Sequence, residues 1–99
     1  MTGKYLGKIK SVSFGYCEYL FGLHFELGGE DWGTCTSYQY NPIYKNEPKE
    51  LHSVEMLERI QQLLKSAKVD RVEKLKDKPI EATFEGSLLK EWRILTEVL

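Results

Sequence analysis

The 99-residue chain has only two cysteines, three prolines and no long apolar run. Two cysteines cannot build the disulfide framework of a small secreted domain. No stretch approaches the roughly 20 apolar residues that a membrane-spanning helix needs. The opening segment, MTGKYLGKIK, lacks the apolar region of a secretory signal. These absences predict a cytoplasmic protein with reduced thiols and no membrane partner.

Charge of one sign is also scarce, since 14 basic and 15 acidic side chains give a formal net charge of −1. Nucleic-acid-binding proteins usually carry a basic stripe, because neutralising phosphates supplies most of their non-specific affinity. The mildly basic stretch from Lys65 to Lys78 is interrupted by Asp70, Glu73 and Asp77. Broad binding to DNA or RNA is therefore not expected. Length and composition predict one globular domain over residues 1–99.

The clearest pattern is a β-hairpin between Tyr19 and Tyr40. Its first arm alternates with the period of a half-buried strand, and one face consists of Tyr19, Phe21, Leu23, Phe25 and Leu27. Residues 28–31, GGED, predict the turn, because glycine readily adopts the positive φ angles of tight hairpins. The return arm places on one face Trp32, Thr34, Thr36, Tyr38 and Tyr40.

Further strands are predicted near both ends of the chain. Over residues 4–14 the apolar parity changes between Ile9 and Val12, which indicates burial on both faces or a bulge near Lys10. Residues 80–85 alternate, and Gly86-Ser87 predicts a two-residue hairpin turn. One face of the last strand would then contain Leu88, Trp92, Ile94 and Val98.

The segment between these strand regions predicts helices. Asn41 to His52 contains two prolines and predicts an irregular loop. Ser53 is a suitable N-cap for a helix to about Lys68, whose apolar stripe would contain Met56, Leu57, Ile60, Leu63, Leu64 and Ala67. A capping-box pattern from Asp70 to Glu73 predicts a short second helix. The order β-β-β-α-α-β-β indicates an α+β domain, an antiparallel sheet of about five strands with one main amphipathic helix packed on one face.

No arrangement of residues indicates catalysis or a bound metal. Cys17, His24, Cys35 and His52 are zinc-binding residue types, but no pair has the short spacing of a structural zinc site. Cys35 and His24 lie on adjacent hairpin arms without a recognisable oxyanion-binding turn. We therefore expect a protein that is not an enzyme and that uses no metal and no cofactor.

Aromatic residues gather on the return arm and in the loop after it. Trp32, Tyr38, Tyr40 and Tyr44 lie close together in the sequence, and Lys45 adds a positive charge. Tryptophan and tyrosine combine a rigid apolar ring with a polar group, which is favoured at protein interfaces. The same rings can stack on nucleotide bases. These five residues are the candidate binding residues, and the alternative is that about half of them belong to the core.

Three stretches, GKIKSVSFG, LGGEDWG and KPIEATFEGSLLKEWRILTEVL, resemble small accessory proteins encoded by bacteriophages and prophages. The resemblance is dense at the two ends of the chain and weaker over residues 16–22 and 34–55. It implies a phage protein in the cytoplasm of a bacterial host, and no site residue is carried over from it. By analogy, small phage proteins without catalytic motifs often act by binding.

The leading expectation is non-enzymatic binding to a host bacterial protein, as an inhibitor of anti-phage defence such as an anti-CRISPR protein. One alternative is an oligomer that sequesters a nucleotide defence signal, with Tyr38, Tyr40 and Tyr44 stacking on the base and Lys45 or Arg93 contacting phosphate. Another alternative is an accessory factor of phage replication or recombination that binds single strands. The chain is also a candidate homo-oligomer.

Overall fold

The computed structural model describes residues 2–39 and 49–98, and describes only the backbone of residues 49–52. One antiparallel sheet contains five strands in the order β3-β2-β1-β4-β5, namely β1 (Gly3–Cys17), β2 (Leu20–Gly28), β3 (Gly33–Gln39), β4 (Pro79–Glu85) and β5 (Leu88–Ile94). Between β3 and β4 the chain forms α1 (Lys49–Ala67) and the 3-10 helix η1 (Val72–Leu75), and η2 (Thr96–Val98) follows β5. The predicted α+β architecture is confirmed.

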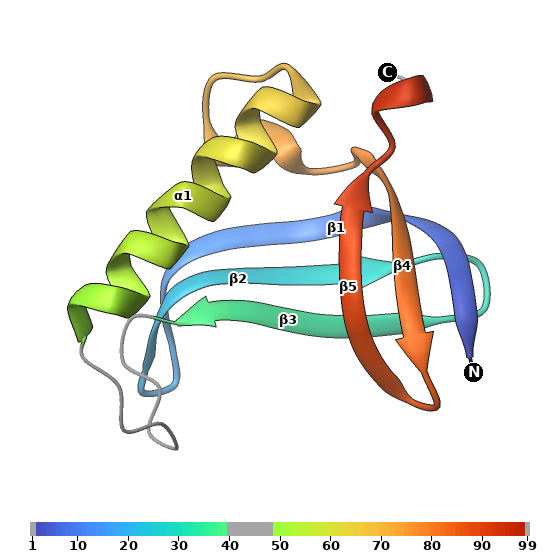
Figure 1. Ribbon diagram of the computed structural model, residues 1–99, viewed down its shortest axis with the longest axis horizontal. Helices are drawn as coiled ribbons and strands as arrows, with labels where there is room; N and C mark the ends of the chain where they lie inside the picture. Colours follow the sequence, from blue (N-terminus) through green and yellow to red (C-terminus); the bar gives the residue numbers. More distant parts are fainter. Residues whose placement is uncertain (1, 40–48, 99) are drawn as a thin grey trace.

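Strand β1 organises the sheet because it pairs with two different strands along its length. Gly3 to Lys8 pair with β4, whereas Lys8 to Cys17 pair with β2. The β1–β2 register shifts between Ile9 and Ser11, which agrees with a bulge near Lys10, one of the two explanations offered for the change of apolar parity. A bulge bends its strand, and β1 curves so that the β4–β5 hairpin crosses the β2–β3 hairpin steeply (Figure 1).

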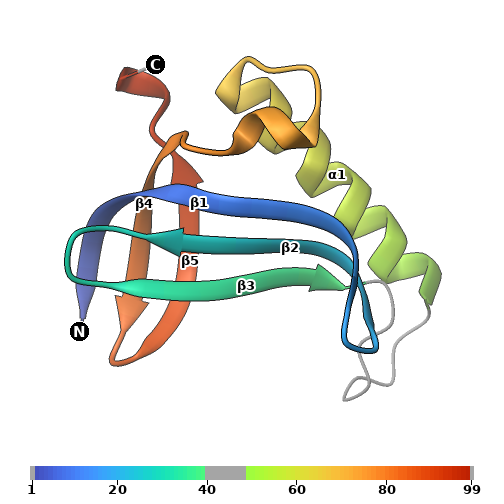
Figure 2. The same ribbon diagram turned by 180° about the vertical axis from the view of Figure 1, so that it is seen from behind.

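The hydrophobic core lies between these crossed hairpins and α1, which covers one end of the sheet (Figures 1 and 2). Alternation in β2 buries Leu23, Phe25 and Leu27, as the hairpin pattern predicted. The other strands and helices complete the core with Ile9, Leu63, Ala67, Leu75, Ile80, Ala82, Phe84, Trp92 and Ile94. The core therefore joins residues from both ends of the chain.

Helix α1 differs from the expectation at its start and across its apolar face. It begins at Lys49 rather than at Ser53, directly after Pro48 in the sequence. Proline suits a helix start, because the amide that it lacks would have no intrahelical acceptor there. Met56 and Leu63 are buried, but Leu57 is 61% exposed. Since Leu57 lies about 100° around the helix from Met56, the sheet covers a narrower arc than the sequence stripe suggested.

Two expectations about the C-terminal half were also wrong. Arg71, not Asp70, is the N-cap of η1, and it makes no side-chain cap hydrogen bond. Asp70 instead pairs with Lys74, with its Oδ1 2.9 Å from the lysine Nζ, and this contact lowers the pKa of Asp70. In β5 the register shifts where Leu89 pairs with Phe84. Leu89 therefore packs against the core, while Leu88 is 64% exposed.

The predicted turn at Gly86-Ser87 is confirmed, because Glu85 pairs with Leu88 and Gly86 has a φ of 63°. Strand β5 ends at Ile94, so Val98 belongs to η2 and is exposed rather than part of the buried strand face.

Candidate binding surfaces

The structure places two of the five predicted binding residues, and it places them apart. Trp32 precedes β3 and Tyr38 lies near its other end, where the two side chains line different hollows. Tyr40, Tyr44 and Lys45 lie outside the described residues, so their binding role stays a prediction. Trp32 and Tyr38 both pack partly against the core.

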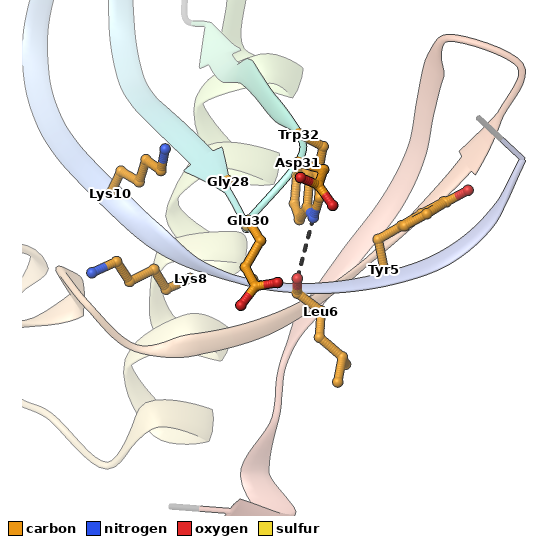
Figure 3. Close-up of a pocket in the computed structure, with 10 residues that line it drawn as sticks. Tyr5, Leu6, Lys8, Lys10, Gly28, Glu30, Asp31 and Trp32 are labelled. Atoms are coloured by element: carbon orange, nitrogen blue, oxygen red, sulfur yellow. Dashed lines mark hydrogen bonds between the residues drawn. The ribbon is translucent and has the colours of Figure 1, made fainter.

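A pocket of about 850 Å³ lies where the β2–β3 turn approaches β1 (Figure 3). Trp32 forms one wall, and its Nε1 donates a hydrogen bond to the carbonyl of Leu6 over 3.2 Å. The indole also packs edge-on against Phe84, with the ring centroids 5.5 Å apart. Position 7 must be glycine, because a Cβ on Gly7 would lie 2.6 Å from Cζ2 of the Trp32 indole. Trp32 therefore shapes the pocket and also fixes the turn to β1.

The pocket carries charges of both signs. Lys8 and Lys10 lie on one side of Glu30, and Tyr5 lies on the other (Figure 3). Lys8 is 3.4 Å from Asp77, measured from Nζ to Oδ1, whereas Lys10 has no ion pair within the described part of the chain. The volume is within the range of small-molecule sites, roughly 300–1,000 Å³. Two lysines and two carboxylates, Glu30 and Asp31, line the pocket, so its formal charge is balanced, and Lys10 is the lysine left to meet an anionic group.

Tyr38 takes part in a contact that joins α1 to two strands. Arg59 donates from Nε to the Tyr38 hydroxyl over 2.9 Å and from Nη2 to the Trp92 carbonyl over 3.0 Å. Its guanidinium carbon lies 5.6 Å and 5.1 Å from the centroids of the same two rings. A groove of about 370 Å³ adjoins this contact, between β3 and β5. Because its hydroxyl is occupied by Arg59, Tyr38 has a structural role here.

Within the described residues, the largest group of exposed aromatic side chains was not among the predicted site residues. We call it the aromatic tip; it lies at the end of the β1–β2 hairpin and consists of Phe14, Tyr16, Tyr19 and Phe21. Tyr16 is 75% exposed, Tyr19 57% and Phe14 51%. The Phe21 ring lies between its neighbours, with its centroid 5.5 Å from that of Phe14 and 5.2 Å from that of Tyr16.

The register explains why the aromatic tip is exposed. Tyr16 pairs with Phe21, and Phe14 pairs with Leu23, so Phe14, Tyr16 and Phe21 share the face that forms the core further along the sheet. Tyr19 lies in the turn between the two strands. Leu23 is fully buried although Phe14 beside it is half exposed. The strands thus extend past the core with their apolar alternation unchanged. The sequence contains the alternation but no signal for where the core ends.

The remaining polar candidates are occupied by structural contacts. Arg93 donates to both carboxylate oxygens of Glu97, over 3.1 Å and 2.9 Å, and to Glu81 over 3.3 Å. This pairing raises the pKa of Arg93 and lowers the pKa of Glu97 to about 2. Arg93 is therefore already neutralised, which disfavours the phosphate contact considered for it.

His24 and the cysteines do not form a nucleophilic pair. His24 lies opposite Ser37, whereas Cys35 lies opposite Glu26. The imidazole of His24 is 2.8 Å from the Ser37 hydroxyl through Nδ1 and 3.0 Å from the Gly15 carbonyl through Nε2. Both cysteines are free and exposed. Among the described side chains, no three metal-ligating groups stand together.

Comparison with known proteins adds no relative, since no protein-family model, curated protein or solved structure matches the chain. Within residues 2–39 and 49–98, no helix is long and apolar enough to cross a membrane.

Proposed function

We propose that this protein acts by binding another protein, and that the aromatic tip is the main contact surface. The observation that carries the proposal is the exposure of Phe14, Tyr16 and Tyr19 at one end of the molecule. Clustered apolar groups at a surface mark interaction sites more often than scattered ones do. Tyrosine is enriched among the residues that dominate binding energy, because its rigid ring loses little entropy and its hydroxyl stays solvated or bonded.

The class of partner follows from the resemblance to phage accessory proteins. We infer that the protein works in the cytoplasm of a bacterial host and that its partner is a component of anti-phage defence, which it inhibits without catalysis. A projecting aromatic hairpin suits this role, since it can insert into a concave site on a folded target. Binding through aromatic side chains is kept from the sequence-based prediction. The main contact surface is now the end of the β1–β2 hairpin instead of β3 and the loop after it.

The test uses the purified chain as bait in lysates of bacteria that carry phage-defence systems, with captured proteins quantified by mass spectrometry. A Phe14→Ala/Tyr16→Ala variant should lose the captured partner, by about 10-fold or more for each hot-spot ring removed. The matched control is Leu57→Ala, an apolar side chain of similar exposure on α1. A partner retained by the tip variant, or lost equally by the control, contradicts the proposal.

A second candidate function is the binding of a nucleotide signal in the pocket beside Trp32. The specific observation is that Lys8, Lys10 and two aromatic side chains line the same 850 Å³ hollow. Heat-denatured protein should then release a nucleotide that mass spectrometry detects. Lys10→Ala should reduce the amount released, whereas Lys90→Ala on β5 should not. Protein purified from a nucleotide-rich lysate without any bound nucleotide contradicts this candidate.

A further inference from the structure

Within the described residues, strand edges are unpaired on β3, on β5, on the N-terminal part of β1 towards β2 and on residues 10–17 of β1 away from β2. Side chains bond backbone groups at two of these edges. Such an edge exposes amide and carbonyl groups that can pair with another chain, so proteins usually protect it. On β1, the carbonyl of Leu6 accepts from the Trp32 indole. On β5, the carbonyl of Trp92 accepts from Arg59, and a register shift near Lys90 interrupts the strand.

Strand β3 lacks these protections. Its sequence GTCTSYQ has no charged residue and no proline, and its pairing with β2 runs from Gly33 to Gln39 without a register shift. Figures 1 and 2 show β3 at the margin of the sheet, on the side of β2 away from β1. A regular, neutral edge of this length is suited to pairing with another strand.

The direction of the free backbone groups follows from one hydrogen bond. Gly29 donates to the carbonyl of Trp32 over 3.0 Å, so the backbone of Trp32 faces β2. Backbone direction alternates along a strand, which turns the amides and carbonyls of Cys35 and Ser37 away from β2. Within the described residues, no backbone or side-chain group bonds them.

We propose that β3 pairs antiparallel with β3 of a second copy of this chain, across a two-fold axis at Thr36. Thr36 is the middle residue of β3, so this axis gives the longest overlap. It places Cys35 opposite Ser37 of the second copy. The backbone amides and carbonyls that point away from β2 in one copy then meet those of the other copy, as an antiparallel ladder requires.

The chemistry of β3 favours an identical strand over a charged foreign one. No like charges meet across the axis, because the strand carries none. The axis pairs Thr36 with Thr36, Thr34 with Tyr38 and Cys35 with Ser37. The threonine–threonine and threonine–tyrosine pairs are favourable cross-strand pairs. Pairing would join two sheets into one continuous sheet through the regular, uncharged edge of β3. The inference rests on β3 alone and does not depend on the aromatic tip or on the pocket.

The decisive experiment is a disulfide cross-link at the axis in a Cys17→Ser/Cys35→Ser background. In the proposed register Thr36 faces Thr36 of the second copy in a non-hydrogen-bonded pair, at a Cα separation of about 4.5 Å, which a disulfide can span. Thr36→Cys should therefore give a covalent dimer under mild oxidation. The control Thr34→Cys should not, because its two copies would lie about 14 Å apart along the strands.

Solution mass provides the second measurement. Light scattering of the wild-type protein should give twice the 11.5 kDa of one chain. Cys35→Pro should convert it to a folded monomer, because proline removes an outward amide and leaves the ladder to β2 intact, while Cys35→Ser should stay dimeric. Should Cys35→Pro fail to fold, the cross-linking comparison still decides.

Three outcomes overturn the inference. The first is a wild-type chain that stays monomeric at all accessible concentrations. The second is a dimer that cross-links equally through Thr34→Cys and Thr36→Cys. The third is a monomer whose Cys35→Pro variant loses a bacterial protein partner, which would assign this edge to a foreign strand.

Discussion

Replacing Leu63 with alanine should destabilise the domain far more than the same replacement at Leu57. Both leucines lie on α1, but Leu63 is 1% exposed and Leu57 is 61% exposed. The two variants therefore make the same chemical change on the same helix and differ only in how deeply the leucine is buried. The comparison tests whether α1 docks with the face that the structure gives it.

The expected magnitude follows from the buried group that is removed. The isopropyl group of Leu63 is worth about 2.4 kcal/mol at roughly 0.8 kcal/mol per buried methylene. The cavity left behind adds to this, so the total cost is about 2–5 kcal/mol. A domain of this length has a free energy of unfolding of about 5–15 kcal/mol. Leu57→Ala should cost less than about 0.5 kcal/mol, since its side chain is already in water.

Urea unfolding measures both variants, followed by far-UV circular dichroism and by tryptophan fluorescence, to which the buried Trp92 contributes. The midpoint should fall strongly for Leu63→Ala and remain near the wild-type value for Leu57→Ala. The slope of the unfolding free energy against urea concentration should be the same for all three proteins, because each exposes the same surface on unfolding. Equal midpoints for the two variants, or a larger loss at Leu57, would refute the proposed docking of α1.

Other perturbations test the contacts around the core. Arg59→Lys should lower the free energy of unfolding by about 1–3 kcal/mol, because lysine cannot bond β3 and β5 with one planar fork; an unchanged urea midpoint would contradict this. Gly7→Ala should lower the melting temperature, whereas Gly33→Ala should have little steric effect because its Cβ would lie 3.8 Å from the nearest atom. Arg93 lowers the pKa of Glu97 from 4.5 to about 2. The stability that this pair contributes is therefore fully present above pH 4.5 and is lost as the pH falls towards 2. Glu97→Gln should weaken that acid dependence at low salt, and equal acid profiles would count against the pairing.

The local features of this fold could be predicted because their signals lie within a few residues. The alternation of Leu23, Phe25 and Leu27 predicted a strand, and the structure buries all three. The change of apolar parity between Ile9 and Val12 left a bulge as one of two explanations, and the register shift selects it. Each of these depends on bond geometry that repeats every second residue.

The candidate site could be predicted only in part. The sequence singled out Trp32 and Tyr38 as aromatic residues near a turn, but not that Trp32 bonds Leu6 or that Tyr38 bonds Arg59. Both partners are distant in sequence, at separations of 26 and 21 residues. Nothing local distinguishes an aromatic ring that binds a partner from one that fixes its own fold.

The sequence by itself determined which residues share a face, and the tertiary structure decided which part of that face is covered. Phe14 and Leu23 sit directly opposite each other, yet only Leu23 is fully buried. Met56 and Leu57 are neighbours on one helix, and only Met56 meets the core. Periodicity comes from the backbone geometry of each strand or helix. Burial depends on which distant segment packs against that face, and the end of that contact at Leu23 leaves the aromatic tip in solvent.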